Sequence, residues 1–495
     1  MSNQPTNFFT KILPVITYLV FTGLIIYTSL FHEKWIDEAQ PWLIARDLDF
    51  WSMLKHLRYE ITPGLWHFIL YPFAHAGFSY FTQTILNLII ILLAAYILLF
   101  RSPFSLPVKI LFIFSYYFSF EYAVIARSYG LTIAILFLLL SIYSRRLSQT
   151  IIFSILLILL AQTNAIGLVI AGALWLISWF DYYLLIKTKK NTKVFLISAF
   201  FVLFGLFLSL IQFWPTADPA HQSIKIFSSI ELPSLINSFV AGFFPYSLLN
   251  IDNFNSYRNF VYIFNYYNLF LALAILAIIT WRFFSSRKII IFLISCFVPL
   301  LFLLSAHRVG HLRHYGFFLI IVIAAYWIDL KSSSCKIITL KEKIFTSFLI
   351  ISLFLLDLIG FRAHYLDQKY LFSDAINVAN YLQQNNLTEQ PIFVTDSFYS
   401  VSILPYLKNH SQFYYLRPEK LGSFFFLDKN FYLTKSKNIN QILENFSRPN
   451  TDQKLILITT ESISIKNQKN WQQLYQTTGY LIGYDDQLFY IYQSR

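Results

Sequence analysis

Long runs of apolar residues, separated by short polar segments, occupy most of this chain before its C-terminal quarter. A helix that crosses a bilayer needs about 20 mostly apolar residues, and about eleven of these runs meet or approach that length. We expect transmembrane helices at Lys11–Phe31, Tyr80–Phe100, Pro107–Ala123, Ser128–Ser144, Gln149–Thr163, Ile166–Ile186, Val194–Trp214, Phe260–Trp281, Lys288–Ser305, Tyr315–Leu330 and Ile344–Phe361. The pattern therefore predicts a polytopic α-helical membrane protein.

The composition and the placement of charge agree with this prediction. Hydrophobic residues make up 57% of the 495 positions and charged residues only 13%, too few to cover a soluble protein of this size. The net charge of +13 is concentrated in alternate short loops, where Glu342 is almost the only acid among many Lys and Arg residues. This positive-inside pattern predicts a multi-pass protein of the plasma (inner) membrane with a cytoplasmic N-terminus. It accounts for the basic surplus without a nucleic-acid partner.

Three longer segments then fall on the outer side of the membrane, at residues 32–79, 215–259 and 362–495. Amphipathic stretches in the first two predict helices that lie on the membrane surface. Tryptophans suit such an interfacial position, and the first segment contains Trp35, Trp42, Trp51 and Trp66. Residues 1–361 are expected to form one transmembrane domain that carries both of these outer loops.

The tail, residues 362–495, predicts a small extracytoplasmic α/β domain. Asp374–Gln384 has a helical pattern. Short apolar runs at Pro391–Thr395 and Lys454–Thr459 are typical of strands, and Thr478–Tyr492 resembles a hairpin. The chain contains no glycine-rich phosphate-binding motif and no HExxH helix.

An acidic pair, Asp37 and Glu38, follows the first predicted span. Charged groups at membrane depth are costly and usually functional. A carboxylate at this position, beside an acceptor hydroxyl, is suited to act as a general base. A solvated acidic loop is the plainer interpretation, and the pair alone favours it.

A second charged cluster contains Glu121 and Arg127, at the outer junction of the third and fourth predicted spans. Six residues apart, these side chains do not share a helix face, but a tight turn would bring them together. One interpretation is an ion pair that holds the turn. The other is an arginine that binds a lipid phosphate and is positioned by the glutamate. The sequence does not separate the two.

A third cluster, residues 307–315, lies at the outer junction of the ninth and tenth predicted spans and includes Arg313 and His314. Its cations are expected to contact phosphate, with snorkelling to the interface as the plainer alternative. His307 and His311 have the i,i+4 spacing of metal ligands on a helix, but no further ligand completes a site. No cofactor is therefore expected, although the binding of a divalent metal stays open as an alternative.

The predicted surface stretch beginning at Pro63 is preceded by Glu60, which either contacts a ligand or is solvated. With it, every charged cluster falls on one side of the membrane. This convergence suggests a cleft that admits a lipid phosphate from the outer leaflet.

The residues around these clusters resemble a known family. The segment from Asp37 to Asp47, beginning Asp-Glu-Ala-Gln-Pro-Trp, is similar to the Asp-Glu motif in the first outer loop of GT-C glycosyltransferases. Among these enzymes, the chain most resembles the glycosyltransferase 39 and 83 group, which includes protein mannosyltransferases and the lipid A aminoarabinose transferase. Residues 121–129 resemble its acidic-Arg-x-Tyr element, and residues 313–315 its late Arg-Tyr element. Two departures lie at residues 61–64, where the family often has His-Pro, and at residues 162–164, where it often has a His.

The resemblance implies a GT-C-like catalytic domain over residues 1–361. It implies a membrane glycosyltransferase that moves a sugar from a polyprenyl-phosphate carrier to an extracytoplasmic lipid, polysaccharide or protein acceptor, with inversion. Membrane lipids would surround the site. The expected roles are a general base for Asp37, site shaping or partial substitution for Glu38, phosphate binding for Arg127 and Arg313, orientation of Arg127 for Glu121, and cleft lining for Glu60, Tyr129, His314 and Tyr315.

Two other functions stay open. A transporter or flippase of lipid-linked sugars would have polar residues near helix middles and broken helices. The charges here gather at one face instead, with Asp181, Asp329 and Asp357 as the exceptions. A membrane assembly protein would use the tail to recruit partners, and this function leaves the charged clusters unexplained.

Overall fold

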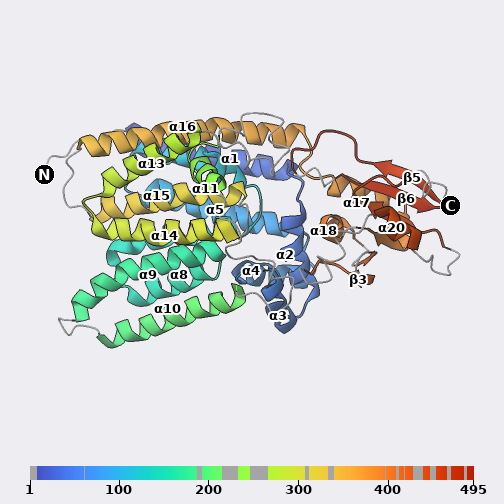
Figure 1. Ribbon diagram of the computed structural model, residues 1–495, viewed down its shortest axis with the longest axis horizontal. Coiled ribbons are helices and arrows are strands. Elements are labelled where there is room, and N and C mark those ends of the chain that lie inside the picture. Colours follow the sequence, from blue (N-terminus) through green and yellow to red (C-terminus); the bar gives the residue numbers. More distant parts are fainter. Residues whose placement is uncertain are drawn as a thin grey trace.

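The computed structural model describes residues 8–60, 62–186, 192–213, 232–245, 266–306, 311–332, 339–395, 397–408, 412–416, 419–426, 439–445, 453–464, 470–483 and 488–495. Within these ranges, nine helices are long and apolar enough to cross a membrane. They are α1 (Phe8–Phe31), α5 (Phe81–Arg101), α7 (Ser128–Ile142, with a 3₁₀ turn to Arg145), α9 (Ala165–Ile186), α10 (Thr192–Phe213), α13 (Tyr266–Phe283), α14 (Arg287–Ala306), α15 (Leu312–Ser332) and α16 (Leu340–Lys369). The chain is thus a polytopic helical membrane protein, as its hydrophobic pattern predicts (Figure 1).

Two predicted spans are shorter than expected. The run at Gln149–Thr163 forms α8 (Thr150–Ala161). The run at Pro107–Ala123 is not one continuous helix, because α6 (Leu106–Phe114) ends at Ser115 and a π-helical turn, η1 (Tyr117–Glu121), follows. Gly360 of α16 packs against this break, where a Cβ atom would lie 2.7 Å from the carbonyl oxygen of Phe114. The sequence pattern missed the break because both halves are apolar.

Burial varies widely among the membrane helices. The apolar window of α15 is 78% buried, so this helix forms the centre of the bundle, whereas that of α10 is 28% buried. Side chains on α10 such as Leu196, Phe200 and Phe207 are exposed, as expected of a helix that faces lipid.

The predicted outer loop 215–259 lies largely outside the described residues. Its described part forms α11 (Leu232–Ala241), which packs against α13 and α15 and buries Asn237, Phe239 and Val240. The expectation of a surface helix is wrong for this segment, because its apolar face contacts other helices.

Three helices form the first outer segment: α2 (Ile36–Asp47), α3 (Phe50–Glu60) and α4 (Leu65–His75). In Figure 1 they lie between the helical bundle and the C-terminal region. Of the four tryptophans assigned to the membrane interface, Trp51 is 70% exposed, but the other three are at most 3% exposed. The interfacial prediction is therefore wrong for those three, because α2 packs against both α4 and the C-terminal region.

The C-terminal region is an α/β structure with a six-stranded mixed sheet of order β3-β2-β1-β4-β6-β5. The predicted helix and both predicted strands are confirmed as α17 (Ala375–Gln384), β1 (Ile392–Val394) and β4 (Ile456–Thr459). β1 and β4 are parallel and fully buried, which suits central strands. The other elements are η6 (Leu387–Glu389), α18 (Ser397–Ser400), η7 (Leu404–Tyr406), β2 (Phe413–Tyr415), β3 (Lys420–Gly422), α20 (Ile439–Asn445), β5 (Trp471–Gln476) and β6 (Tyr490–Ser494).

Two boundaries differ from the prediction. The hairpin placed at Thr478–Tyr492 is formed instead by β5 and β6, which pair antiparallel, with residues 477–489 connecting them. α16 continues to Lys369, eight residues beyond the predicted end of the last span at Phe361, and so extends from the bundle to the C-terminal region.

Candidate active site

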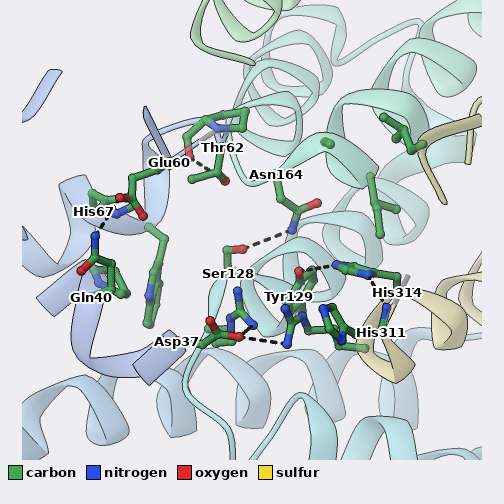
Figure 2. A pocket seen from close by; sticks show the side chains of 18 of the residues that line it. Asp37, Gln40, Glu60, Thr62, His67, Ser128, Tyr129, Asn164, His311 and His314 are labelled. Carbon is green, nitrogen blue, oxygen red and sulfur yellow. Dashed lines mark hydrogen bonds and ion pairs between the residues drawn. The ribbon is translucent and has the colours of Figure 1, made fainter. Parts of the chain in front are cut away.

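A cavity of about 470 Å³ lies where α2 and α4 meet the membrane helices and the C-terminal region (Figure 2). The first turns of five helices line it: α2 contributes Asp37, α4 Trp66 and His67, α7 Ser128 and Tyr129, α9 Ala165 and Ile166, and α15 Arg313 and His314. Each helix N-terminus carries a partial positive charge and unpaired N–H groups. Five such ends around one space favour an anionic ligand.

Asp37 lies between two arginines on the wall of this cavity. Its Oδ2 atom forms an ion pair with Nη1 of Arg127 and another, at 2.9 Å, with Nη1 of Arg313. Burial alone would raise the pKa of Asp37, but Arg127 and Arg313, with His311, lower it below its usual value. All three predicted groups are thus in contact, and Asp37 is a carboxylate at neutral pH.

Glu38 is adjacent in sequence but points away from the cavity, and its side chain is fully buried. Its Oε1 atom accepts a hydrogen bond from the backbone N–H of Ala126 at 2.9 Å, and its Oε2 atom lies 3.2 Å from Nε2 of His32. Asp367 contacts the other ring nitrogen of His32 at 3.0 Å. This arrangement favours site shaping over substitution for Asp37, because Glu38 fixes the residue that precedes Arg127.

Tyr129 and His314 line the cavity as predicted and contact each other. The Tyr129 hydroxyl lies 3.0 Å from Nε2 of His314, while Nδ1 of His314 accepts the backbone N–H of His311 at 3.0 Å. A neutral His314 therefore carries its proton on Nε2 and donates a hydrogen bond from Nε2 to the Tyr129 hydroxyl. Tyr315 does not line the cavity: it is buried on the side of α15 that faces Ser238 of α11.

Glu121 ends the π-helical turn and is 3% exposed. Its Oε2 atom accepts a hydrogen bond from Tyr116 at 2.7 Å. The turn that follows leads to Arg127, so Glu121 lies in the segment that carries the arginine, and its role in orienting that residue stays a prediction. π-helical turns often occur at functional sites.

Glu60 and Gln40 lie together on the side of the cavity away from Tyr129 and His314 (Figure 2). Nε2 of Gln40 donates to Oε1 of Glu60 at 2.9 Å and to the carbonyl oxygen of Phe425 at 2.8 Å. The backbone N–H of Phe425 returns a hydrogen bond to Oε1 of Gln40 at 3.2 Å. Gln40 therefore ties α2 to the C-terminal region, which contributes Phe398 and Phe425 to the cavity.

Several lining residues were missed by the sequence analysis, including His67, Asn164 and Phe425. The available signal was the two departures from the resembled pattern, at residues 61–64 and 162–164, because the structure brings these two segments together at the cavity. The backbone N–H of Leu65, directly after Gly64, donates to the carbonyl oxygen of Gln162 at 3.0 Å. Asn164 caps α9 through the N–H of Gly167 and lines the cavity.

The remaining wall is apolar. Leu300, Leu303 and Leu304 of α14 and Ile166 of α9 line it. Both helices are membrane spans, so the cavity has a charged wall at the junction and a hydrocarbon-like wall toward the bundle. This combination suits an amphiphile with an anionic head group.

The charged residues predicted near other span ends belong to separate clusters. Asp181 forms ion pairs with Arg146 and, at 2.6 Å, with Lys288. Asp329 pairs with Arg282 at 2.8 Å. In the described residues, no group of three or more His, Cys, Asp or Glu side chains is placed to hold a metal ion.

Comparison with protein-family models, with curated proteins and with solved structures finds no match to this chain.

Proposed function

We propose that this protein is a membrane glycosyltransferase that transfers a sugar from a polyprenyl-phosphate carrier to an acceptor hydroxyl. The observation that carries the proposal is the contact of Asp37 with Arg127 and Arg313 on the wall of a cavity that also has an apolar wall. A carboxylate supplies a base, two guanidinium groups match a phosphate, and the leucines of α14 suit a polyprenyl chain.

The reaction breaks the bond between the anomeric carbon and the phosphate oxygen and forms one between that carbon and the acceptor oxygen. Asp37 takes the acceptor proton, and the electron pair of the broken bond stays on the phosphate, which leaves as polyprenyl phosphate. Arg127 and Arg313 stabilise the charge that develops on the phosphate. Attack from the face opposite the leaving group inverts the anomeric centre.

Asp37 also holds the two guanidinium groups together. An arriving phosphate competes for the same Arg127 and Arg313 groups and adds a negative charge beside Asp37. Both effects raise the pKa of Asp37: the first weakens the ion pairs that lower it, and the second repels the ionised carboxylate. The carboxylate therefore becomes a stronger base when the donor is bound.

The charge of the loops indicates the side of the membrane on which the reaction would occur. The basic loops predict a cytoplasmic N-terminus, and the cavity and the C-terminal region would then be extracytoplasmic. In an inner membrane, the acceptor would then be a lipid, polysaccharide or protein of the cell envelope.

The test is release of the carrier. Purified protein in lipid nanodiscs is incubated with radiolabelled polyprenyl-phosphate sugars and an envelope extract as the acceptor, and free polyprenyl phosphate is measured. Asp37→Asn should reduce release by about 10²–10⁴-fold, because a general base contributes that much. Membrane insertion should be normal, with Asp47→Asn, at the exposed end of α2, as the matched control. Full activity of Asp37→Asn would refute the assignment of the base.

A flippase of lipid-linked sugars is the second candidate. The observation that favours it is Asp357, a 6% exposed carboxylate in the middle of α16 whose Oδ1 atom has no hydrogen-bond partner among the described residues. A flippase would move the lipid across the bilayer and leave the sugar–phosphate bond intact. The same incubation separates the two functions, since only the transferase releases free carrier.

A further inference from the structure

Two buried polar side chains on α4 face the cavity without a hydrogen-bond partner. His67 is 4% exposed and Trp66 is 3% exposed, and both line the space. Neither ring nitrogen of His67 nor Nε1 of Trp66 is hydrogen-bonded to any residue that the structure describes. Buried polar atoms are nearly always paired in folded proteins, so three adjacent exceptions at a cavity wall indicate groups that a ligand satisfies.

The chemistry of this wall differs from that around Asp37. Burial lowers the pKa of His67 to about 4, although Glu60 acts in the opposite direction, so the imidazole is neutral at pH 7. A neutral imidazole offers one donor and one acceptor, and the indole of Trp66 offers one donor. Neutral donors and acceptors match hydroxyl groups, whereas the guanidinium groups beside Asp37 match a phosphate.

The neighbouring groups extend this character. Glu60, whose Oε1 atom accepts from Gln40, lies on the same wall and adds carboxylate acceptors. Phe398 and Phe425 line the cavity with ring centroids 4.8 Å apart and present aromatic surface. A few oriented polar groups among aromatic side chains are typical of sites that bind small polar rings.

We propose that Glu60, Trp66 and His67 form a hydroxyl-binding subsite for a sugar ring. The inference rests on the proposed function, because it assigns the phosphate to Arg127 and Arg313 and the sugar to the wall that carries Glu60 and α4. The sugar belongs either to the donor or to a glycan acceptor, since both present the same hydroxyl chemistry.

The test is binding by the full-length protein in nanodiscs. One arm compares bare polyprenyl phosphate with a panel of carriers that bear one hexose or pentose, and a second arm uses soluble oligosaccharides without carrier. The variants are His67→Phe, which removes the polar atoms, and His67→Gln, which keeps a donor and an acceptor. His75→Phe, on the same helix but hydrogen-bonded to a backbone carbonyl at the surface, is the matched control. Arg127→Gln probes the phosphate separately.

We expect at least one sugar-bearing carrier to bind about tenfold more tightly than the bare carrier, as one or two hydrogen bonds provide. His67→Phe should abolish this difference, His67→Gln should retain part of it, and neither should change the affinity for the bare carrier. Binding of an oligosaccharide that depends on His67 would assign the subsite to the acceptor. Equal affinity for the bare and the sugar-bearing carriers, without such oligosaccharide binding, would overturn the proposal. An equal loss of affinity for both kinds of carrier in His67→Phe would also overturn it. Failure of the proposed function would give a different result: Arg127→Gln would then leave the binding of the bare carrier unchanged, or the bare carrier would not bind at all.

Discussion

Replacing His32 with glutamine tests how the junction between the bundle and the C-terminal region is held. The His32 side chain is 2% exposed and lies between Glu38, at 3.2 Å, and Asp367, at 3.0 Å. Glutamine removes the cation and leaves two buried carboxylates facing each other. Removing one partner of a buried ionic cluster is strongly destabilising, because the remaining charge is uncompensated.

The magnitude follows from proton binding. Burial alone would lower the pKa of His32, but Asp367 and Glu38 raise it from 6.5 to about 10. Because the folded state binds this proton more tightly, the stabilisation is complete below pH 6.5 and is lost as the pH rises toward 10. At 1.36 kcal/mol per pKa unit, it amounts to about 5 kcal/mol at low pH, about 4 kcal/mol at pH 7 and less than about 1 kcal/mol at pH 10.

The assay is thermal unfolding of the purified protein in detergent, followed by tryptophan fluorescence between pH 6 and pH 10. We expect His32→Gln to unfold at a temperature lower by on the order of 10 °C at pH 7. The difference from wild type should shrink steadily toward pH 10. His75→Gln, an exposed histidine on α4, should behave as wild type throughout. A pH-independent difference, or none at pH 7, would refute the reasoning.

Two further predictions concern packing. Gln40→Leu removes the pair of hydrogen bonds to Phe425, so amide hydrogen exchange at Phe425 should accelerate while exchange in β1 and β4 stays unchanged; equal exchange at Phe425 would show that Gln40 does not hold this contact. Gly360→Ala places a Cβ atom 2.7 Å from a backbone oxygen of α6 and should destabilise the protein by about 1–3 kcal/mol in the same thermal assay. Gly23→Ala is its control, because nothing lies within 4 Å of a Cβ there, and equal stability of the two variants would contradict the close approach of α16.

The sequence by itself determined the class of the protein and the position of most elements. Apolar runs predict membrane helices because every backbone polar group within a bilayer must be paired inside its own helix. The same local rule located α17 from its period and β1 and β4 from their short apolar runs. Asp37, Arg127 and Arg313 were identified as candidates because charge near a membrane is costly, and this argument needs no knowledge of neighbours.

Only the tertiary structure decided how the members of each cluster divide their tasks. Asp37 and Glu38 are adjacent in sequence, but successive side chains of a helix diverge, so one faces the cavity and the other contacts His32 and Ala126. The break after α6 packs against Gly360, which is more than 200 residues away. His67 was not a candidate from the sequence, because the burial of its two nitrogens without a hydrogen-bond partner among the described residues is a property of the packed structure. Contacts between distant segments decided these features, and local patterns carry no record of such contacts.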